Sequence, residues 1–183
     1  MKRFQLAWVL LMAFCFTACA QHPSQKQEKR MKQKVLVAYF SCTGNTERVA
    51  KAIAKETDGT LYRITPAAPY TDADLNWHND KSRSSVEMND ENVRPAQKEQ
   101  SAKAEEYDVI YLGYPIWWDL CPRIVNTFLE AYRLDGKTVI PFATSGSSSI
   151  TNSVKELKKK YPAIRWQAGK RFSSPNEVKE WIK

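Results

Sequence analysis

The feature that most constrains the fold is residues 35–50, where a strand pattern runs directly into a helix pattern. Residues 35–40 are almost continuously apolar, as in a strand that is buried on both faces of a sheet. A loop of hydroxyl residues, Gly and Asn follows, and residues 47–55 then carry apolar side chains at helical spacing. Such a connection directs free backbone N–H groups and the positive end of the helix dipole toward one point. We therefore expect an anion to bind where the helix begins.

The composition of this loop indicates how the anion is held. Ser41, Thr43 and Thr46 offer hydroxyl donors, and Gly44 lets the backbone approach a ligand closely. No Lys or Arg occurs at positions 41–46, so the Lys that follows the last Gly of a P-loop is missing. The loop is therefore expected to bind phosphate with neutral dipoles.

Strand and helix patterns alternate along the rest of the chain, which predicts an α/β fold with a parallel sheet. The expected strands after the first are 61–64, 109–113, 139–143 and 164–167. The expected helices after the first are 124–132, 150–161 and a last one that opens at a capping box, 174–177. Residues 66–103 are far longer than an ordinary connection, and they are predicted to be either a surface excursion or part of the site.

Three loops follow strands at one edge of the predicted sheet, at 41–46, 114–118 and 144–149. In a doubly wound sheet, ligands bind beyond the carboxyl ends of the strands, where the strand order reverses. The first loop is the phosphate cradle, the second carries two adjacent indoles, and the third is rich in small residues with hydroxyl and backbone donors. A flat aromatic ligand that bears one phosphate would suit all three loops.

These loops resemble those of the flavodoxins, and in particular of a branch of small bacterial flavodoxin-like proteins. The likeness rests on Ser-x-Thr-Gly-Asn-Thr at 41–46, Tyr-Pro-Ile-Trp-Trp at 114–118 and Pro-Phe-Ala-Thr-Ser-Gly at 141–146, and it extends over about residues 34–172. It implies a flavodoxin-like doubly wound sheet of five parallel strands in the order 2-1-3-4-5, with an insertion after the second strand. It also implies FMN as the cofactor.

The same resemblance assigns the cofactor-binding residues. The first loop would hold the phosphate, the second would lie along the ribityl chain and the ring with Trp117 as the stacking indole, and the third would offer backbone contacts to the pyrimidine side. The residues assigned in this way are Ser41, Cys42, Thr43, Gly44, Asn45, Thr46, Pro115, Ile116, Trp117, Trp118, Thr144, Ser145 and Gly146. No catalytic residue and no metal ligand is assigned.

The chain departs from better-known flavodoxins in two ways. Its third loop is rich in Ser and lacks a second aromatic residue, so one flavin face is either open or covered by Tyr70 or Trp77 from the insertion. Its formal net charge is +8, whereas electron-carrier flavodoxins are usually acidic. Positive surroundings favour the anionic reduced flavin, so we expect a less negative reduction potential. Nucleic acid is not an expected partner, because the basic residues are dispersed and no recognition motif is present.

The N-terminal segment has the features of an export signal. Lys2 and Arg3 precede an apolar run at 4–18, which is shorter than the roughly 20 residues that span a membrane. We expect a signal peptide at 1–18, a lipid on Cys19, a polar tether at 19–33 and a flavodoxin-like domain at 34–183. The protein would then be lipid-anchored to a membrane of the bacterial cell envelope. The alternative is cleavage before Gln21, which would give a soluble periplasmic protein.

Three functions are compatible with a flavin in the envelope. The first is electron transfer to a redox partner protein or a small electron acceptor, and the absence of a dinucleotide fingerprint favours it. The second is an NAD(P)H-dependent reductase of a quinone or another small acceptor, which an open flavin face would favour. The third is a structural or storage role.

Cys42 allows two further hypotheses. With Arg48 it fits the C-x5-R loop of low-molecular-weight tyrosine phosphatases, in which a Cys thiolate is the nucleophile. Against this, Val49 stands where those enzymes usually have Ser, and no convincing Asp loop follows near the C-terminus. Cys42 and Cys121 could also form a disulfide in an oxidising compartment.

Overall fold

The central feature of the molecule is a parallel sheet with the path β2-β1-β3-β4-β5, the order that the resemblance to flavodoxins implies. The computed structural model describes residues 33–183; the predicted signal peptide, Cys19 and all of the tether except residue 33 lie outside the described residues. The strands are β1 (Val35–Tyr39), β2 (Thr60–Arg63), β3 (Val109–Pro115), β4 (Thr138–Thr144), β5 (Arg165–Trp166) and β6 (Lys170–Phe172).

The sixth strand shares an edge position with the fifth instead of extending the sheet. β5 pairs with the first two residues of β4, and β6 pairs with its last three. Pro141, between these two stretches of β4, has no N–H to donate to the ladder. Gly169 lies against it, because a Cβ there would come within 3.0 Å of the Pro141 carbonyl oxygen. The sequence pattern predicts a single strand along this edge of the sheet, at 164–167. The structure has two short strands instead, separated beside the point where Pro141 of β4 lacks a donor.

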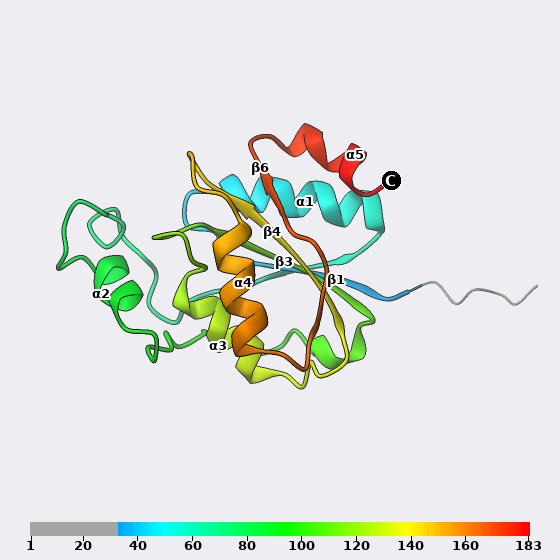
Figure 1. Cartoon of the computed structure of the whole chain (residues 1–183), viewed down its shortest axis with the longest axis horizontal. Helices are drawn as coiled ribbons and strands as arrows, with labels where there is room; N and C mark the ends of the chain where they lie inside the picture. The colour runs from blue at the N-terminus through cyan, green and yellow to red at the C-terminus, as the bar shows by residue number, and fades with distance from the viewer. Residues whose placement is uncertain (1–32) are drawn as a thin grey trace, which may run out of the picture. The chain divides into compact units, whose positions relative to one another are not determined.

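Helices cover both faces of the sheet (Figure 1). On one face, Val49, Ala50 and Ile53 of α1 (Asn45–Thr57) share a buried cluster with Val178 of α5 (Val178–Trp181). On the other face, α3 (Arg123–Ala131) and α4 (Thr151–Lys160) contribute to the larger cluster. The predicted capping box is present, and it opens the 3-10 turn η2 (Pro175–Glu177) that leads into α5. Within residues 33–183, no helix is long and apolar enough to cross a membrane.

The long insertion contains the short helix α2 (Arg83–Asn89) and ends before the 3-10 turn η1 (Ala104–Glu106). Ser82 caps α2, since its side-chain oxygen accepts a hydrogen bond from the N–H of Ser85. Figure 1 shows α2 projecting beyond one end of the sheet. The insertion is therefore positioned to build on the loops that leave that end.

Candidate functional site

The loop after β1 leaves the start of α1 open to a ligand. Gly44 adopts a left-handed conformation with φ of 81°, and α1 has no side-chain hydrogen bond at its N-cap. The backbone N–H groups of the first turn therefore keep their donor capacity, and they lie at the positive end of the helix dipole. The Ser41 hydroxyl accepts from the N–H of Gly44 at 3.1 Å, which holds the loop in this shape. The geometry matches the anion site predicted from the sequence.

Arg63, on β2, brings a positive charge to this loop, which itself contains no Lys or Arg. Arg63 donates through Nη2 to the carbonyl oxygen of Ser41 at 3.1 Å, and its other terminal nitrogen lies 3.7 Å from the carboxylate of Glu47. Arg48 also binds this loop, at an exposed position, where it donates to Oδ1 of Asn45 at 2.5 Å. Sequence spacing could not reveal Arg63, because only the parallel pairing of β1 with β2 brings it to the loop.

The two indoles after β3 lie on a tight hairpin. Trp117 and Leu120 exchange backbone hydrogen bonds of 2.9 Å in both directions. The two residues between them, Trp118 and Asp119, both have positive φ, at 47° and 60°. A left-handed pair suits a two-residue hairpin turn, yet it is costly for a Trp. Strain of this kind is typical of positions that are held for function.

The insertion holds the first of these indoles in place. The Tyr70 ring contacts the Trp117 ring edge-on at 5.4 Å between centroids, and Phe40 contacts the same ring at 5.7 Å. The Tyr70 hydroxyl donates to the buried carboxylate of Glu87, which also accepts from Nε of Arg83 at 2.6 Å. The Arg83 guanidinium lies 4.0 Å from the centroid of the Tyr70 ring. Burial and the Glu87 carboxylate together raise the pKa of Tyr70.

A cavity of about 600 Å³ joins these pieces. Its walls include eight of the residues predicted to bind the cofactor, which come from the first two loops. They are Ser41, Cys42, Thr43, Thr46, Pro115, Ile116, Trp117 and Trp118. The insertion adds Leu75, Trp77 and Ser84, which sequence reasoning did not assign to the site, although it named Trp77 as a possible cover. The insertion is therefore part of the cavity and not only a surface excursion.

The remaining predicted residues support the cavity without lining it. Gly44 and Asn45 shape the first loop, and Gly146 lies within the third. The Thr144 hydroxyl makes a 2.8 Å hydrogen bond with the hydroxyl of Thr46, and it thereby ties β4 to the first turn of α1. The Ser145 hydroxyl accepts hydrogen bonds from two backbone N–H groups of its own loop, so this side chain is engaged within the loop. Consequently the third loop presents two later residues to the cavity, Ser147 and Ser148.

The chemistry of Cys42 does not match a phosphatase nucleophile. Burial raises the pKa of its thiol to about 12, although the nearby Arg63 and Arg83 act in the opposite direction. A nucleophilic Cys needs a lowered pKa, because the thiolate is the reactive form. Arg48 is engaged with Asn45 and does not line the cavity. Cys42 and Cys121 are both free thiols, so the disulfide hypothesis is not supported.

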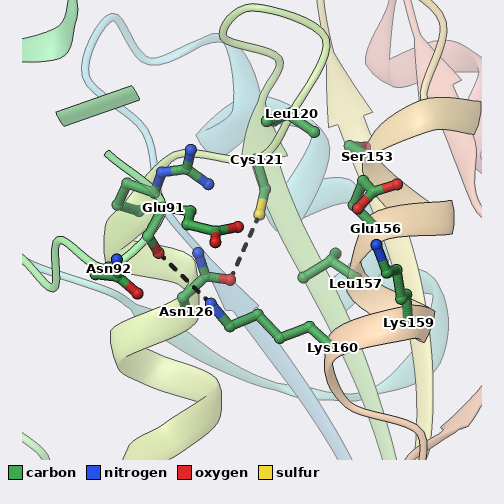
Figure 2. Close-up of a pocket in the computed structure, with 11 residues that line it drawn as sticks. Glu91, Asn92, Leu120, Cys121, Asn126, Ser153, Glu156, Leu157, Lys159 and Lys160 are labelled. Carbon is green, nitrogen blue, oxygen red and sulfur yellow. Dashed lines mark hydrogen bonds between the residues drawn. The ribbon is translucent and has the colours of Figure 1, made fainter. Parts of the chain in front are cut away.

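A second cavity, of about 420 Å³, lies between α3, α4 and the segment that directly follows α2. Figure 2 draws the residues that line it. Cys121 lines it, and its thiol lies 4.0 Å from Oδ1 of Asn126. Lys160 donates to the carbonyl oxygen of Glu91 at 3.5 Å on the opposite wall. Side chains of both charge signs line this space, and none of the predicted cofactor residues does. It is therefore separate from the site at the strand ends.

Comparisons with known proteins agree with this geometry. The flavodoxin family matches residues 34–183. The chain is similar to a solved structure described as a flavoprotein from Bacteroides uniformis, with 56% identity, a TM-score of 0.79, and coverage of 82% of this chain and 97% of that one. A similarly described protein from Bacteroides eggerthii shows 53% identity, a TM-score of 0.78, and coverage of 82% and 96%.

A more distant structure, the flavoprotein from Lactobacillus acidophilus in complex with FMN, shares 23% identity with a TM-score of 0.66 and coverage of 82% and 99%. At that identity the likeness shows a common fold. No curated protein matches the chain. The family match includes the whole sheet, the loop before α1 and every wall of the cavity at the strand ends. The chain therefore belongs to the flavodoxin family.

Proposed function

We propose that the protein binds FMN in the cavity at the strand ends and transfers electrons in the bacterial cell envelope. One observation carries the proposal: the uncapped first turn of α1 opens at the same cavity that three indoles line. A phosphate suits the helix start, and a flat ring suits the indoles. The Lactobacillus flavoprotein, which shares this fold, is described in complex with FMN.

The residues present fit such a cofactor. Thr43, Thr46 and the N–H groups of the first α1 turn would hold its phosphate, with the Arg63 charge close by. Pro115, Ile116 and the indole of Trp117 would line its ring and chain, and Ser147 and Ser148 would add hydroxyl donors. FMN would supply the reversible uptake of one or two electrons. The protein would bind and orient it and exclude water from one side of the ring.

The envelope location rests on the sequence, through the lipid expected on Cys19. We expect the unmodified protein in the membrane fraction and a Cys19→Ser variant outside it. Fractionation followed by immunoblotting measures this, with Cys15→Ser as the matched control inside the signal segment. A Cys19→Ser variant that stays in the membrane fraction would contradict the anchor. The partner of the anchored protein would be a redox protein or a small acceptor.

A substitution at Thr46 tests cofactor binding. Thr46 is only 1% exposed, lines the cavity, and bonds to Thr144. We expect Thr46→Val to weaken FMN binding by about 10- to 150-fold, since one hydrogen bond to a charged group is worth roughly 1.5–3 kcal/mol. Riboflavin, which has no phosphate, should bind both forms equally weakly. Thr57→Val is the control, because it makes the same change at the other end of α1.

Fluorescence titration of the FMN-free proteins with FMN and with riboflavin measures these affinities. Equal FMN affinity for the Thr46 and Thr57 variants would contradict the assigned phosphate site. An unmodified protein that does not bind FMN at all would overturn the proposed function.

A further inference from the structure

Two tryptophan side chains are exposed at the cavity where FMN is proposed to bind. Trp77 is 65% exposed and Trp118 is 45% exposed, and both line it. Large aromatic surfaces in a hollow are costly to leave in water, and they are typical of ligand-binding sites. Only two other large apolar side chains in residues 33–183, Leu61 and Val86, are comparably exposed, and neither lines this cavity.

The number of indoles exceeds what one cofactor ring can use. Trp77, Trp117 and Trp118 all line the cavity, whereas a planar ring has only two faces. Trp117 and Trp118 come from the loop beside the phosphate cradle, but Trp77 comes from the insertion. The Trp77 ring lies 3.5 Å from the ring of His78, which occupies one of its faces. Because Trp77 is nevertheless 65% exposed, its indole still offers apolar surface to a second planar molecule.

The walls also indicate the charge of that molecule. No Asp, Glu, Lys or Arg side chain lines the cavity among the described residues. Ser84, from the insertion, supplies a hydroxyl that is nearly buried, and its nearest hydrogen-bonding partner is the Ser82 hydroxyl at 3.4 Å. That long contact leaves the Ser84 hydroxyl free to donate to a carbonyl oxygen. An uncharged planar ligand with a ring carbonyl satisfies both the indole and the hydroxyl.

We infer that Leu75, Trp77 and Ser84 form a binding subsite for a quinone beside the cofactor ring, an inference that rests on the FMN binding proposed above. The quinone ring stacks on the Trp77 indole, and one carbonyl oxygen accepts from the Ser84 hydroxyl. In the reaction, the quinone takes up two electrons and two protons and becomes a hydroquinone. Anionic two-electron-reduced FMN would supply the two electrons and one proton as a hydride, solvent water would supply the second proton, and a redox partner protein would return two electrons to the oxidised cofactor.

The first test measures binding without turnover. The FMN-loaded full chain is kept oxidised, so that it does not react with 1,4-naphthoquinone, and the dissociation constant is measured by calorimetry. We expect saturable binding that Trp77→Ala weakens by about tenfold and Trp77→Phe by less, because aromatic stacking is lost or reduced. Val86→Ala, an exposed apolar side chain on α2 outside the cavity, should leave the binding unchanged.

The second test follows electron transfer. The cofactor is reduced with dithionite and mixed with naphthoquinone or with ferricyanide, a charged acceptor that needs no apolar site. We expect Trp77→Ala to raise the half-saturating quinone concentration by a much larger factor than it changes the ferricyanide rate.

Three outcomes would overturn the inference. If Trp77→Ala weakens FMN binding and leaves quinone binding intact, Trp77 covers the cofactor instead. If the FMN-loaded protein binds quinone without saturation, the subsite does not exist, although the proposed function stands. If the unmodified protein does not bind FMN, both the function and the subsite fail.

Discussion

At the Cys42 thiol, burial outweighs the attraction of two nearby guanidinium groups. Arg63 and Arg83 favour the thiolate, while burial and the Glu87 carboxylate oppose it, and the result is a pKa of about 12. The thiol therefore stays protonated in the pH range of most cells. A small neutral side chain in the first loop is compatible with a phosphate that is held by backbone and hydroxyl donors.

This pKa predicts how Cys42 reacts. For a pKa of about 12, roughly one thiol in 10,000 is ionised at pH 8, far fewer than for a free Cys. We expect iodoacetamide to modify Cys42 slowly in the native FMN-free protein, at a rate that rises about tenfold per pH unit up to pH 10 without a plateau. Peptide mass spectrometry distinguishes Cys42 from Cys121, and urea-unfolded protein is the reference. A plateau below pH 8 would show an activated thiolate and would revive the phosphatase hypothesis.

At the scale of the elements, the sheet is packed closely where β3 passes β4. A Cβ on Gly113 would lie 2.1 Å from the Phe142 ring, so the ring occupies the space that a side chain would need. We expect Gly113→Ala to lower the free energy of unfolding by about 2–3 kcal/mol through overpacking. Urea denaturation measures this. Gly146→Ala is the matched control, because no atom lies within 4 Å of its added Cβ.

A second substitution that relieves the clash tests whether overpacking causes the loss of stability. A second substitution, Phe142→Leu, should recover part of the stability in the Gly113→Ala background but lower it in the unmodified protein. Equal losses from Gly113→Ala and Gly146→Ala would contradict the packing argument.

We expect the hydrogen bond from Tyr70 to Glu87 to stabilise the fold of the insertion. Tyr70→Phe removes one donor from a buried carboxylate that keeps its ion pair with Arg83. We expect a loss of about 2 kcal/mol in unfolding free energy and a change in the near-ultraviolet circular dichroism of Trp117, which Tyr70 contacts. Tyr62→Phe is the control, since its hydroxyl donates to the exposed carbonyl of Glu99 and not to a buried carboxylate. An unchanged spectrum would show that Tyr70 does not position the indole.

The sequence predicted those strands and helices whose buried side chains are apolar and recur at strand or helix spacing. The parallel strands β1 to β5 follow from alternating strand and helix patterns, whereas their order in the sheet was implied by the resemblance to flavodoxins. The hydroxyls and Gly44 of the first loop predicted an anion site at the start of α1. Helix α2 was missed because its buried side chains are mostly polar (Ser84, Ser85, Glu87 and Met88), so no apolar period marks it. β6 was missed because Pro141 interrupts the edge beside it.

Within the site, the predicted residues that directly follow β1 and β3 mostly line the cavity. In the third loop, the Ser145 hydroxyl accepts from backbone N–H groups of its own loop, and Ser147 and Ser148 line the cavity where Thr144, Ser145 and Gly146 were predicted. Sequence reasoning could not assign Leu75 and Ser84, since only the tertiary fold brings the insertion to the strand ends.

At the scale of the whole molecule, the positive charge is partly concentrated at the site. The chain has a formal net charge of +8, and three guanidinium groups bind the loops at the strand ends. Arg48 binds Asn45, Arg63 binds the Ser41 carbonyl, and Arg171 binds the Ser145 carbonyl at 3.1 Å. None of the three lines the cavity, so they act on a bound cofactor through their field and not by contact.

That field predicts how the reduction potential depends on salt. Positive charge stabilises the reduced, anionic cofactor, and the Debye length shortens from about 30 Å at 0.01 M to 3 Å at 1 M ionic strength. We expect the midpoint potential to fall by about 20 mV over that range, roughly 1 kcal/mol for a two-electron couple. Arg171→Gln should lower it at low salt, whereas Arg165→Gln should not, because Arg165 pairs with Thr138 at the opposite end of β4. A potential that salt and both substitutions leave unchanged would show that the charge of this chain does not tune its cofactor.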